Sequence, residues 1–527
     1  MSMLSIFILL SAIPYPSNPS WESVSGYVST GGGHADFNGD GITDFAVGEG
    51  NDMSQDPNHV YYGNGTSFST SPSWTSSDSR YSGHIAIGDV NGDGHPDLTV
   101  SDYIRSGWGK TVSVLYMNTG TGLGTTPAWE SDSAHSFACG FGDVNGDGRP
   151  ELAFACGEAY NGFDEKALIY LNTGTGYSST PWWQSYHSYT AYDVTFGDVN
   201  RDGWLDMVLA GNYMPVCLFL NKRGYYATTP DWESSGDYEV IQCALGDVNG
   251  DGWLDLAIAE NGQLAGRSRV WVFMNQSGSF ENTPSWNSQD SRSYYSTVAF
   301  GDPDSDGDLD LVAGGWWEPA VIFENIGGVL QKPPAWSWYR SGLVCEKITF
   351  GGVDNGGLVT IADTFTLSGR GNVVQLRKLP FHELISLDIN STDVPVSDLY
   401  AAPEEGFVCF DTSYTTPGTN TIIVAYTYST SQDMTITNWE DGMGNYLFLN
   451  NSAATAELPD AKGGIVIFPN PFVSEALVSG IQGEAELYDA SGRLLGRLKD
   501  GRFGSELSPG VYFIGSGVQK VKVVKGR

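Results

Sequence analysis

The sequence contains few basic residues and no long apolar run. Its 527 residues include 26 lysines and arginines against 62 aspartates and glutamates, which gives a formal net charge of −36 at pH 7. This negative charge argues against nucleic-acid binding, because phosphates attract basic surfaces. The run of roughly 18 apolar residues that a membrane-spanning helix needs occurs nowhere, so we expect no transmembrane segment.

Cysteine and histidine are also scarce. Six cysteines are too few for a disulfide-rich scaffold, and Cys139 and Cys156 either cross-link across a hairpin or remain buried thiols. The seven histidines show no metal-type spacing and no serine–histidine–aspartate order, and no glycine loop for phosphate is present. The sequence therefore predicts no catalytic residue and no organic cofactor. A polysaccharide lyase or hydrolase stays open as the alternative to a binding protein.

Against these absences, one acidic loop occurs six times, at intervals of about 54 residues. Each copy carries side-chain oxygens at positions 1, 3, 5 and 9, a glycine at position 6, and a carbonyl to offer at position 7. Such oxygens suit calcium better than magnesium or zinc, so the six loops predict about six Ca²⁺ ions. The alternative is a set of solvated turns without metal. The predicted ligands are Asp36, Asn38, Asp40, Ile42, Asp44, Asp89, Asn91, Asp93, His95, Asp97, Asp143, Asn145, Asp147, Arg149, Glu151, Asp198, Asn200, Asp202, Trp204, Asp206, Asp247, Asn249, Asp251, Trp253, Asp255, Asp302, Asp304, Asp306, Asp308 and Asp310.

The residues around each loop predict a β-hairpin. Position 12, which is acidic in helical calcium loops, is apolar in all six copies, and a short apolar strand follows each loop. A Pro-x-Trp motif shares the same period, and its seven tryptophans should pack in the core or between repeats. Four short strands per period and seven tryptophans predict a seven-bladed propeller over residues 19–381. These tryptophans are Trp21, Trp74, Trp129, Trp183, Trp232, Trp286 and Trp336.

This region resembles the FG-GAP/VCBS family of calcium-binding propellers, which is also known from integrin α-chain heads. The resemblance rests on Phe-Gly-Asp-Val-Asn-type runs, clearest at Phe141–Glu151 and Phe196–Asp206. It implies an all-β propeller with calcium at hairpin tips on one face. It does not imply a ligand, because propellers carry many functions.

The seventh repeat departs from the pattern. Its loop frame near residue 352 has lost three of the four ligands and keeps only Asp354, so we expect no calcium there. The last blade should run from about Glu346 to Leu379 and lack an outer strand. The strand around Ser20–Val24 should complete it and tie the chain ends together, unless His382–Leu387 supplies that strand locally.

The remaining segments predict further β domains. Residues 383–452 alternate apolar and polar residues, as in a small β-sandwich, and residues 453–463 read as a linker. Residues 464–527 contain Phe468–Phe472, Glu486–Leu494 and Leu507–Ile514 in an order that resembles a type A sorting domain of type IX secretion. That resemblance implies secretion machinery as a partner and a secreted or surface location on a bacterium.

The N-terminus is less regular. Residues 1–18 contain an apolar run suited to a signal segment, but the first basic residue is Arg80. The signal is therefore atypical, or the true start lies upstream; an intracellular protein fits a sorting domain poorly.

Binding to a glycan, or to a surface or matrix protein, is the predicted function, and a passive spacer is a further alternative. Trp204 and Trp253 occupy position 7 of neighbouring loops. They should either stack on a ligand together or each pack over its own loop.

Overall fold

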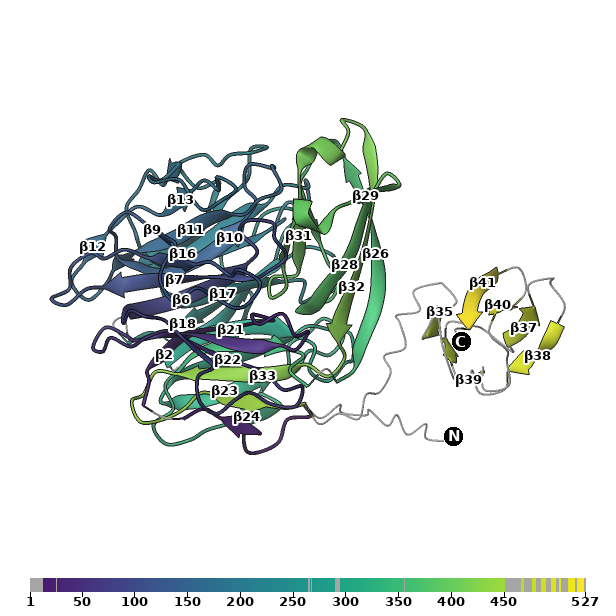
Figure 1. Cartoon of the computed structure of the whole chain (residues 1–527), viewed down its shortest axis with the longest axis horizontal. Helices are drawn as coiled ribbons and strands as arrows, with labels where there is room; N and C mark the ends of the chain where they lie inside the picture. The colour runs from purple at the N-terminus through teal and green to yellow at the C-terminus, as the bar shows by residue number, and fades with distance from the viewer. Residues whose placement is uncertain are drawn as a thin grey trace. The chain divides into compact units, whose positions relative to one another are not determined.

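The computed structural model describes residues 13–450 apart from 25, 264, 265, 267, 290–293 and 355, and beyond them only the strands β35–β41. The chain divides into two compact units, 1–454 and 455–527. The described residues are almost entirely strands, joined in antiparallel sheets (Figure 1). None of the described helices is long and apolar enough to span a membrane.

The first unit repeats one antiparallel sheet motif. The first three sheets are β2 (Ser29–Ala35), β3 (Asp44–Glu49), β4 (His59–Tyr61) and β5 (Trp74–Thr75); β6 (Tyr81–Gly88), β7 (Asp97–Ile104), β8 (Val114–Tyr116) and β9 (Trp129–Glu130); and β10 (Ser136–Gly142), β11 (Glu151–Glu158), β13 (Leu168–Tyr170) and β14 (Trp183–Gln184), with β12 (Phe163–Asp164) beside β11. The second strand of each is buried along its whole length, polar residues included.

The next repeats follow the same order. The fourth and fifth share the long strand β17: β15 (Thr190–Gly197), β16 (Asp206–Phe219), β17 (Trp232–Gly246), β18 (Asp255–Glu260), β19 (Arg269–Phe273) and β20 (Trp286–Asn287). The sixth consists of β21 (Tyr294–Gly301), β22 (Asp310–Trp316), β23 (Glu318–Phe323) and β24 (Trp336–Trp338).

The first strands of the repeats pack against one another in cyclic order, the arrangement of a β-propeller. Contacts run from β2 through β6, β10, β15, β17 and β21 to β25 (Cys345–Gly351), and β25 contacts β2. The approach is close: a Cβ atom on Gly83 would lie 2.0 Å from the carbonyl oxygen of Phe137. Only glycine fits at such a position without a backbone shift.

The sheet that contains β25 corrects the predicted seventh repeat. β25 pairs with β33 (Asp433–Asn438), which pairs with β34 (Tyr446–Phe448), whereas Leu358 begins a strand of another sheet. Residues 433–448 therefore belong to the propeller and not to a separate sandwich over 383–452.

The predicted N-terminal closing strand is confirmed. β1 (Trp21–Glu22) pairs with β34 as the fourth strand of that sheet, with Trp21 opposite Leu447. The alternative strand, His382–Leu387, lies elsewhere, in β28. Ile13 and Tyr15, which fall within the predicted signal segment 1–18, are buried in the same hydrophobic cluster as Trp338; residues 1–12 lie outside the described residues.

An insertion separates β25 from β33. It forms one sheet from β26 (Leu358–Ser368), β32 (Thr419–Ser429), β28 (Phe381–Ile389) and β29 (Thr392–Val394), and a second from β27 (Val373–Gln375), β31 (Phe407–Phe410) and β30 (Leu399–Ala402), with 3-10 turns at Val396–Asp398 and Thr412–Tyr414. The two sheets bury a core of their own, which includes Phe381, Val408 and Tyr426. The insertion stands along one side of the propeller in Figure 1.

The second unit contains two antiparallel sheets. These are β35 (Val466–Phe468), β36 (Ala476–Ser479) and β39 (Arg502–Phe503), and β38 (Leu494–Leu498), β37 (Ala485–Asp489), β40 (Gly510–Ser516) and β41 (Gln519–Lys525). The predicted linker 453–463 lies outside the described residues, as do Pro469–Phe472 of the first motif.

Candidate functional site: the acidic loops

The second loop shows how the sequence folds each hairpin tip. Asp89 Oδ1 accepts hydrogen bonds from the amides of Gly92 (2.8 Å) and Asp93 (3.1 Å), and its Oδ2 accepts one from Gly94 (2.7 Å). Asn91 Oδ1 accepts from the amide of Asp93 at 2.9 Å, and Asp93 Oδ1 from that of His95 at 3.0 Å. Alternating oxygens thus turn inward because the loop's own amides orient them.

Position 9 joins the loop to the sheet. Asp97 is fully buried; its Oδ2 accepts from the amide of Val90 (2.9 Å) and its Oδ1 from that of Asn118 (2.7 Å). Burial raises the pKa of Asp97 to about 7, and the charges of Asp89 and Asp93 add to the rise. A cation among these carboxyl groups would reverse that effect, since opposite charge favours the ionised form.

The same contacts recur in the other loops. The amides of Phe37, Val144 and Val248 donate to the position-9 carboxylate of their own loops at 2.9, 2.9 and 3.2 Å. In the fourth loop, the amide of Asn200 donates to Asp206 at 3.2 Å. In all six loops the carboxylate at position 1 accepts from the amide of position 6, and that at position 5 accepts from the amide of position 7.

The sixth loop gathers carboxylates most closely. Asp302, Asp304 and Asp306 place oxygens within 4.8 Å of one another, the one acidic group of this kind in the described part of the chain. Lys378 of the insertion donates to Asp302 Oδ2 at 3.2 Å. Asp310 Oδ2 is buried with no hydrogen-bond partner among the described residues, and burial raises the pKa of Asp310 to about 9. This donor set fits a hard divalent cation.

The seventh hairpin keeps the frame but only the acidic residues at positions 3 and 9. The amides of Val353 and Asp354 donate to Asp433 Oδ2 at 2.8 and 3.2 Å, so Asp433 is its position-9 carboxylate. Glycines stand at the former positions 1 and 5. A frame of nine consecutive residues would place position 9 at Thr360, but the insertion separates the loop from its return strand.

The insertion covers part of the loop face. Trp204 is buried, and its Nε1 donates to the carbonyl of Arg370 at 2.9 Å, so it cannot pair with Trp253 as a stacking surface. The guanidinium of Arg201 lies 5.2 Å from the ring centroid of Trp253. The hypothesis of a tryptophan pair that stacks on a ligand is therefore wrong, because the insertion occupies the space above Trp204.

Two repeated side chains join neighbouring repeats. Pro-x-Trp indoles donate to the following repeat, as from Trp74 to the carbonyl of Leu123 at 2.9 Å, which confirms their predicted packing role. Sequence reasoning missed the asparagine that follows the third strand, although it recurs in every repeat after the first, where Gly63 takes its place. Its Nδ2 donates to the position-2 carbonyl of the preceding loop. The pairs are Asn118 to Phe37, Asn172 to Val90, Asn221 to Val144, Asn275 to Val199, Asn325 to Val248 and Asn450 to Pro303.

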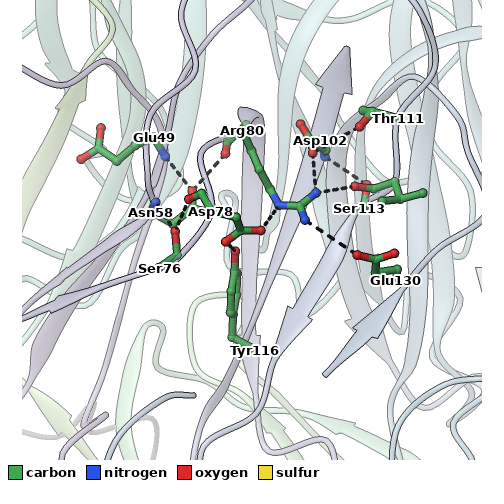
Figure 2. A network of polar contacts seen from close by, with 12 residues as sticks. Glu49, Asn58, Ser76, Asp78, Arg80, Asp102, Thr111, Ser113, Tyr116 and Glu130 are labelled. Atoms are coloured by element: carbon green, nitrogen blue, oxygen red, sulfur yellow. Dashed lines mark hydrogen bonds and ion pairs between the residues drawn. The ribbon is translucent and has the colours of Figure 1, made fainter. Parts of the chain in front are cut away.

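An ion pair adds to the junction between the first two repeats. Arg80 donates from Nε to Asp78 at 2.6 Å and from Nη1 to Asp102 at 2.8 Å (Figure 2). Asp102 is buried, and burial raises its pKa to about 7 despite the lowering by Arg80. The charged pair therefore depends on Arg80 remaining in place.

The positions of Cys139 and Cys156 decide between a cross-link and two buried thiols. Cys139 lies opposite Phe154 in the hairpin and Cys156 opposite Ser136, so the two do not face each other. All six cysteines are buried free thiols.

Comparison with known proteins supports the repeat. A model described as FG-GAP-like repeat matches residues 36–100, 198–258 and 247–313. No curated protein matches the chain. Among solved structures, BBS1N in complex with ARL6DN, in a lead-soaked crystal, aligns at 10% identity and a TM-score of 0.41, covering 63% of this chain and 89% of that one. The mercury-soaked crystal gives 11%, 0.43, 63% and 89%. The chain is thus an all-β protein with FG-GAP-like repeats in a β-propeller.

Proposed function

We propose that this chain is an exported, seven-bladed, calcium-stabilised propeller that binds a glycan or a protein at the bacterial surface or outside the cell. The observation that carries the proposal is the repetition of one loop geometry. The loop's own amides hold the carboxylates at positions 1 and 5 in six hairpins, and the amide of position 2 or 3 holds the position-9 carboxylate in five of them. Bound calcium would neutralise carboxylates that repel one another, and so stabilise the sheet junctions near them.

The residues fit calcium in number and chemistry. Each loop offers four carboxylate or amide side chains and one carbonyl, and water would complete a shell of six to eight oxygens. In the second loop the Nδ2 of Asn91 donates to Asp93 at 3.0 Å. An amide has oxygen and nitrogen ends, so rotation of Asn91 would present oxygen to a cation.

Isothermal titration of the full chain with calcium tests the metal. We expect about six sites with dissociation constants of about 10⁻⁴ to 10⁻³ M, as in extracellular modules. The double variant Asp89→Asn/Asp93→Asn should lose one site. The matched control is Asp354→Asn in the seventh hairpin, which should lose none. A titration without calcium heat at any concentration would contradict the proposal.

Export and binding have separate tests. Removal of residues 464–527 should leave a folded propeller that stays in the periplasm of a host with type IX secretion, whereas normal surface delivery would refute that role. Binding of the calcium-loaded chain to a glycan array or to matrix proteins tests the module. Hydrolysis or elimination on a polysaccharide panel would instead favour the enzyme.

A further inference from the structure

A cavity lies at the end of the propeller opposite the acidic loops. The loops follow the last residues of the first strands, whereas this cavity is lined by the starts of those strands, including Thr30, Ser82, Phe137 and Tyr192. Its volume is about 450 Å³, which is enough for a small molecule. We call it the axial cavity. The insertion, which covers loops at the other end, contributes none of its described lining residues.

Aromatic rings form much of the wall. Phe137 lies between Tyr103 and Tyr192, with ring centroids 5.1 and 4.8 Å away. Trp316 and Trp317 stand on another side with centroids 6.3 Å apart, and Trp317 is 46% exposed. Exposed aromatic faces beside a hollow attract cations and apolar groups, because the ring face carries negative charge.

Four buried polar atoms at this cavity lack a partner within the described part of the chain. They are Asp52 Oδ1, Asn212 Oδ1, Asn261 Nδ2 and Glu346 Oε2. The side chains of Glu346, Asn261 and Asn212 are 2%, 1% and 3% exposed, so bulk water does not reach them freely. Buried polar groups are normally hydrogen-bonded, and four exceptions at one cavity indicate a ligand that completes them.

The charges that line the cavity limit the chemical class of its ligand. The described lining contains four carboxyl groups, those of Asp52, Glu239, Glu346 and Glu440, and no lysine, arginine or histidine. Trp316 Nε1 donates to Glu346 Oε1 at 2.8 Å, which fixes the carboxyl group and leaves its other oxygen available. Burial raises the pKa of Glu346 to about 8, with Asp52 adding to the rise. A cation beside Glu346 would relieve that penalty.

We propose that the axial cavity binds a small organic cation with N–H donors, a protonated primary amine or a guanidinium group. Three of the four unpartnered atoms are oxygen acceptors, which the N–H groups of such a cation would satisfy, and the aromatic wall favours an organic cation over a metal ion. The proposal deepens the binding role proposed above. It rests on that role, but neither on calcium nor on export.

Calorimetric titration of the calcium-saturated full chain at pH 7, where the amines of both probes are mostly protonated, tests the proposal. Glucosamine and agmatine are the probes. N-acetylglucosamine is the control without a charge, and tetramethylammonium is the cationic control without N–H donors. We expect the two probes to bind at least about tenfold more tightly than their controls, a difference of about 1.4 kcal/mol. Equal binding of glucosamine and N-acetylglucosamine would indicate a neutral-sugar site and overturn the proposal.

Variants locate the binding. Glu346→Gln should weaken glucosamine at least about tenfold, whereas the exposed control Glu233→Gln should leave it unchanged. Trp317→Ala, at an exposed position, should also weaken it while folding is retained. Unchanged affinity in both cavity variants would overturn the site. Calcium binding without any probe binding would contradict this inference alone, whereas probe binding without calcium binding would contradict the calcium proposal alone.

Discussion

Six hairpins of the propeller run directly from their first strand through an acidic loop into the second strand, whereas the seventh leaves at Gly351 and returns at Asp433. Both kinds keep the position-9 carboxylate. In both, that carboxylate accepts a hydrogen bond from the amide of loop position 2, which is Val90 in the second hairpin and Val353 in the seventh. Asn450 joins the seventh hairpin to the sixth as Asn118 joins the second to the first. Position 9 thus belongs to the hydrogen bonding of the propeller itself, as does the asparagine in every repeat after the first. The seventh hairpin, by contrast, forms with glycine at positions 1 and 5.

Removal of residues 1–26 should have the largest effect, because it takes β1 from the interrupted hairpin's sheet. Trp21 is buried against Tyr61 and Phe68 with ring centroids 5.5 and 5.3 Å away. Loss of such a tryptophan costs about 3–5 kcal/mol by itself. Chemical denaturation should show a lower free energy of unfolding for the first unit. A matched deletion of 1–12 keeps Ile13, Tyr15 and β1 and should unfold like the full chain; equal stability of both deletions would place the closure elsewhere.

Calcium removal should come next and should act through the continuous hairpins. At 10 mM calcium, dissociation constants of about 10⁻⁴ to 10⁻³ M give roughly 1.4–2.7 kcal/mol per site. Differential scanning calorimetry with excess EGTA should therefore show a melting temperature lower than in calcium. Magnesium at the same concentration is the control and should restore little, since it demands octahedral geometry. An unchanged melting temperature would contradict calcium as a stabiliser.

Two arginines sharpen the contrast between an ordinary junction and the closing one. Arg80 pairs with buried Asp102, and its replacement by methionine should cost about 3–5 kcal/mol because the carboxylate stays buried without its partner. Arg340 pairs with Glu22 at 2.7 Å, but both are well exposed. Arg340→Met should cost less than about 1 kcal/mol.

Urea denaturation of both arginine variants measures the difference. Asp102→Asn in the Arg80→Met background should recover part of the loss, since the buried charge is gone. Similar costs for the two arginine variants would show that burial at the first junction does not decide the energy.

The smallest effect separates the two uses of position 9. Asp97→Asn and Asp433→Asn each remove one charged acceptor, and each should cost about 1–2 kcal/mol without metal. In calcium, Asp97→Asn should lose roughly 1.4–2.7 kcal/mol more of the free energy of unfolding than Asp433→Asn, because only Asp97 belongs to a proposed metal site. Paired melting curves in calcium and in EGTA give this double difference. A calcium-independent gap would mean that Asp97 is no ligand.

The sequence alone determined the repeat, the hairpin tips and the closing strand. The loops are local: Asp89, Asn91 and Asp93 bond to amides within five residues, so nine consecutive residues contain nearly all the information. Trp21 could be placed because its motif recurs with a fixed spacing before each loop.

Only the tertiary structure decided the partner of β25, the covering of Trp204 and the axial cavity. Gly351 pairs with Asp433 across an insertion that has its own core. Local sequence patterns do not reveal a strand pairing over so long a separation in the chain. The cavity brings together Asp52, Asn212, Asn261 and Glu346 from four repeats, and no spacing in the sequence marks them. Such a site exists because strands far apart in the chain begin at the same end of the propeller, whereas a loop is built from neighbours along the backbone.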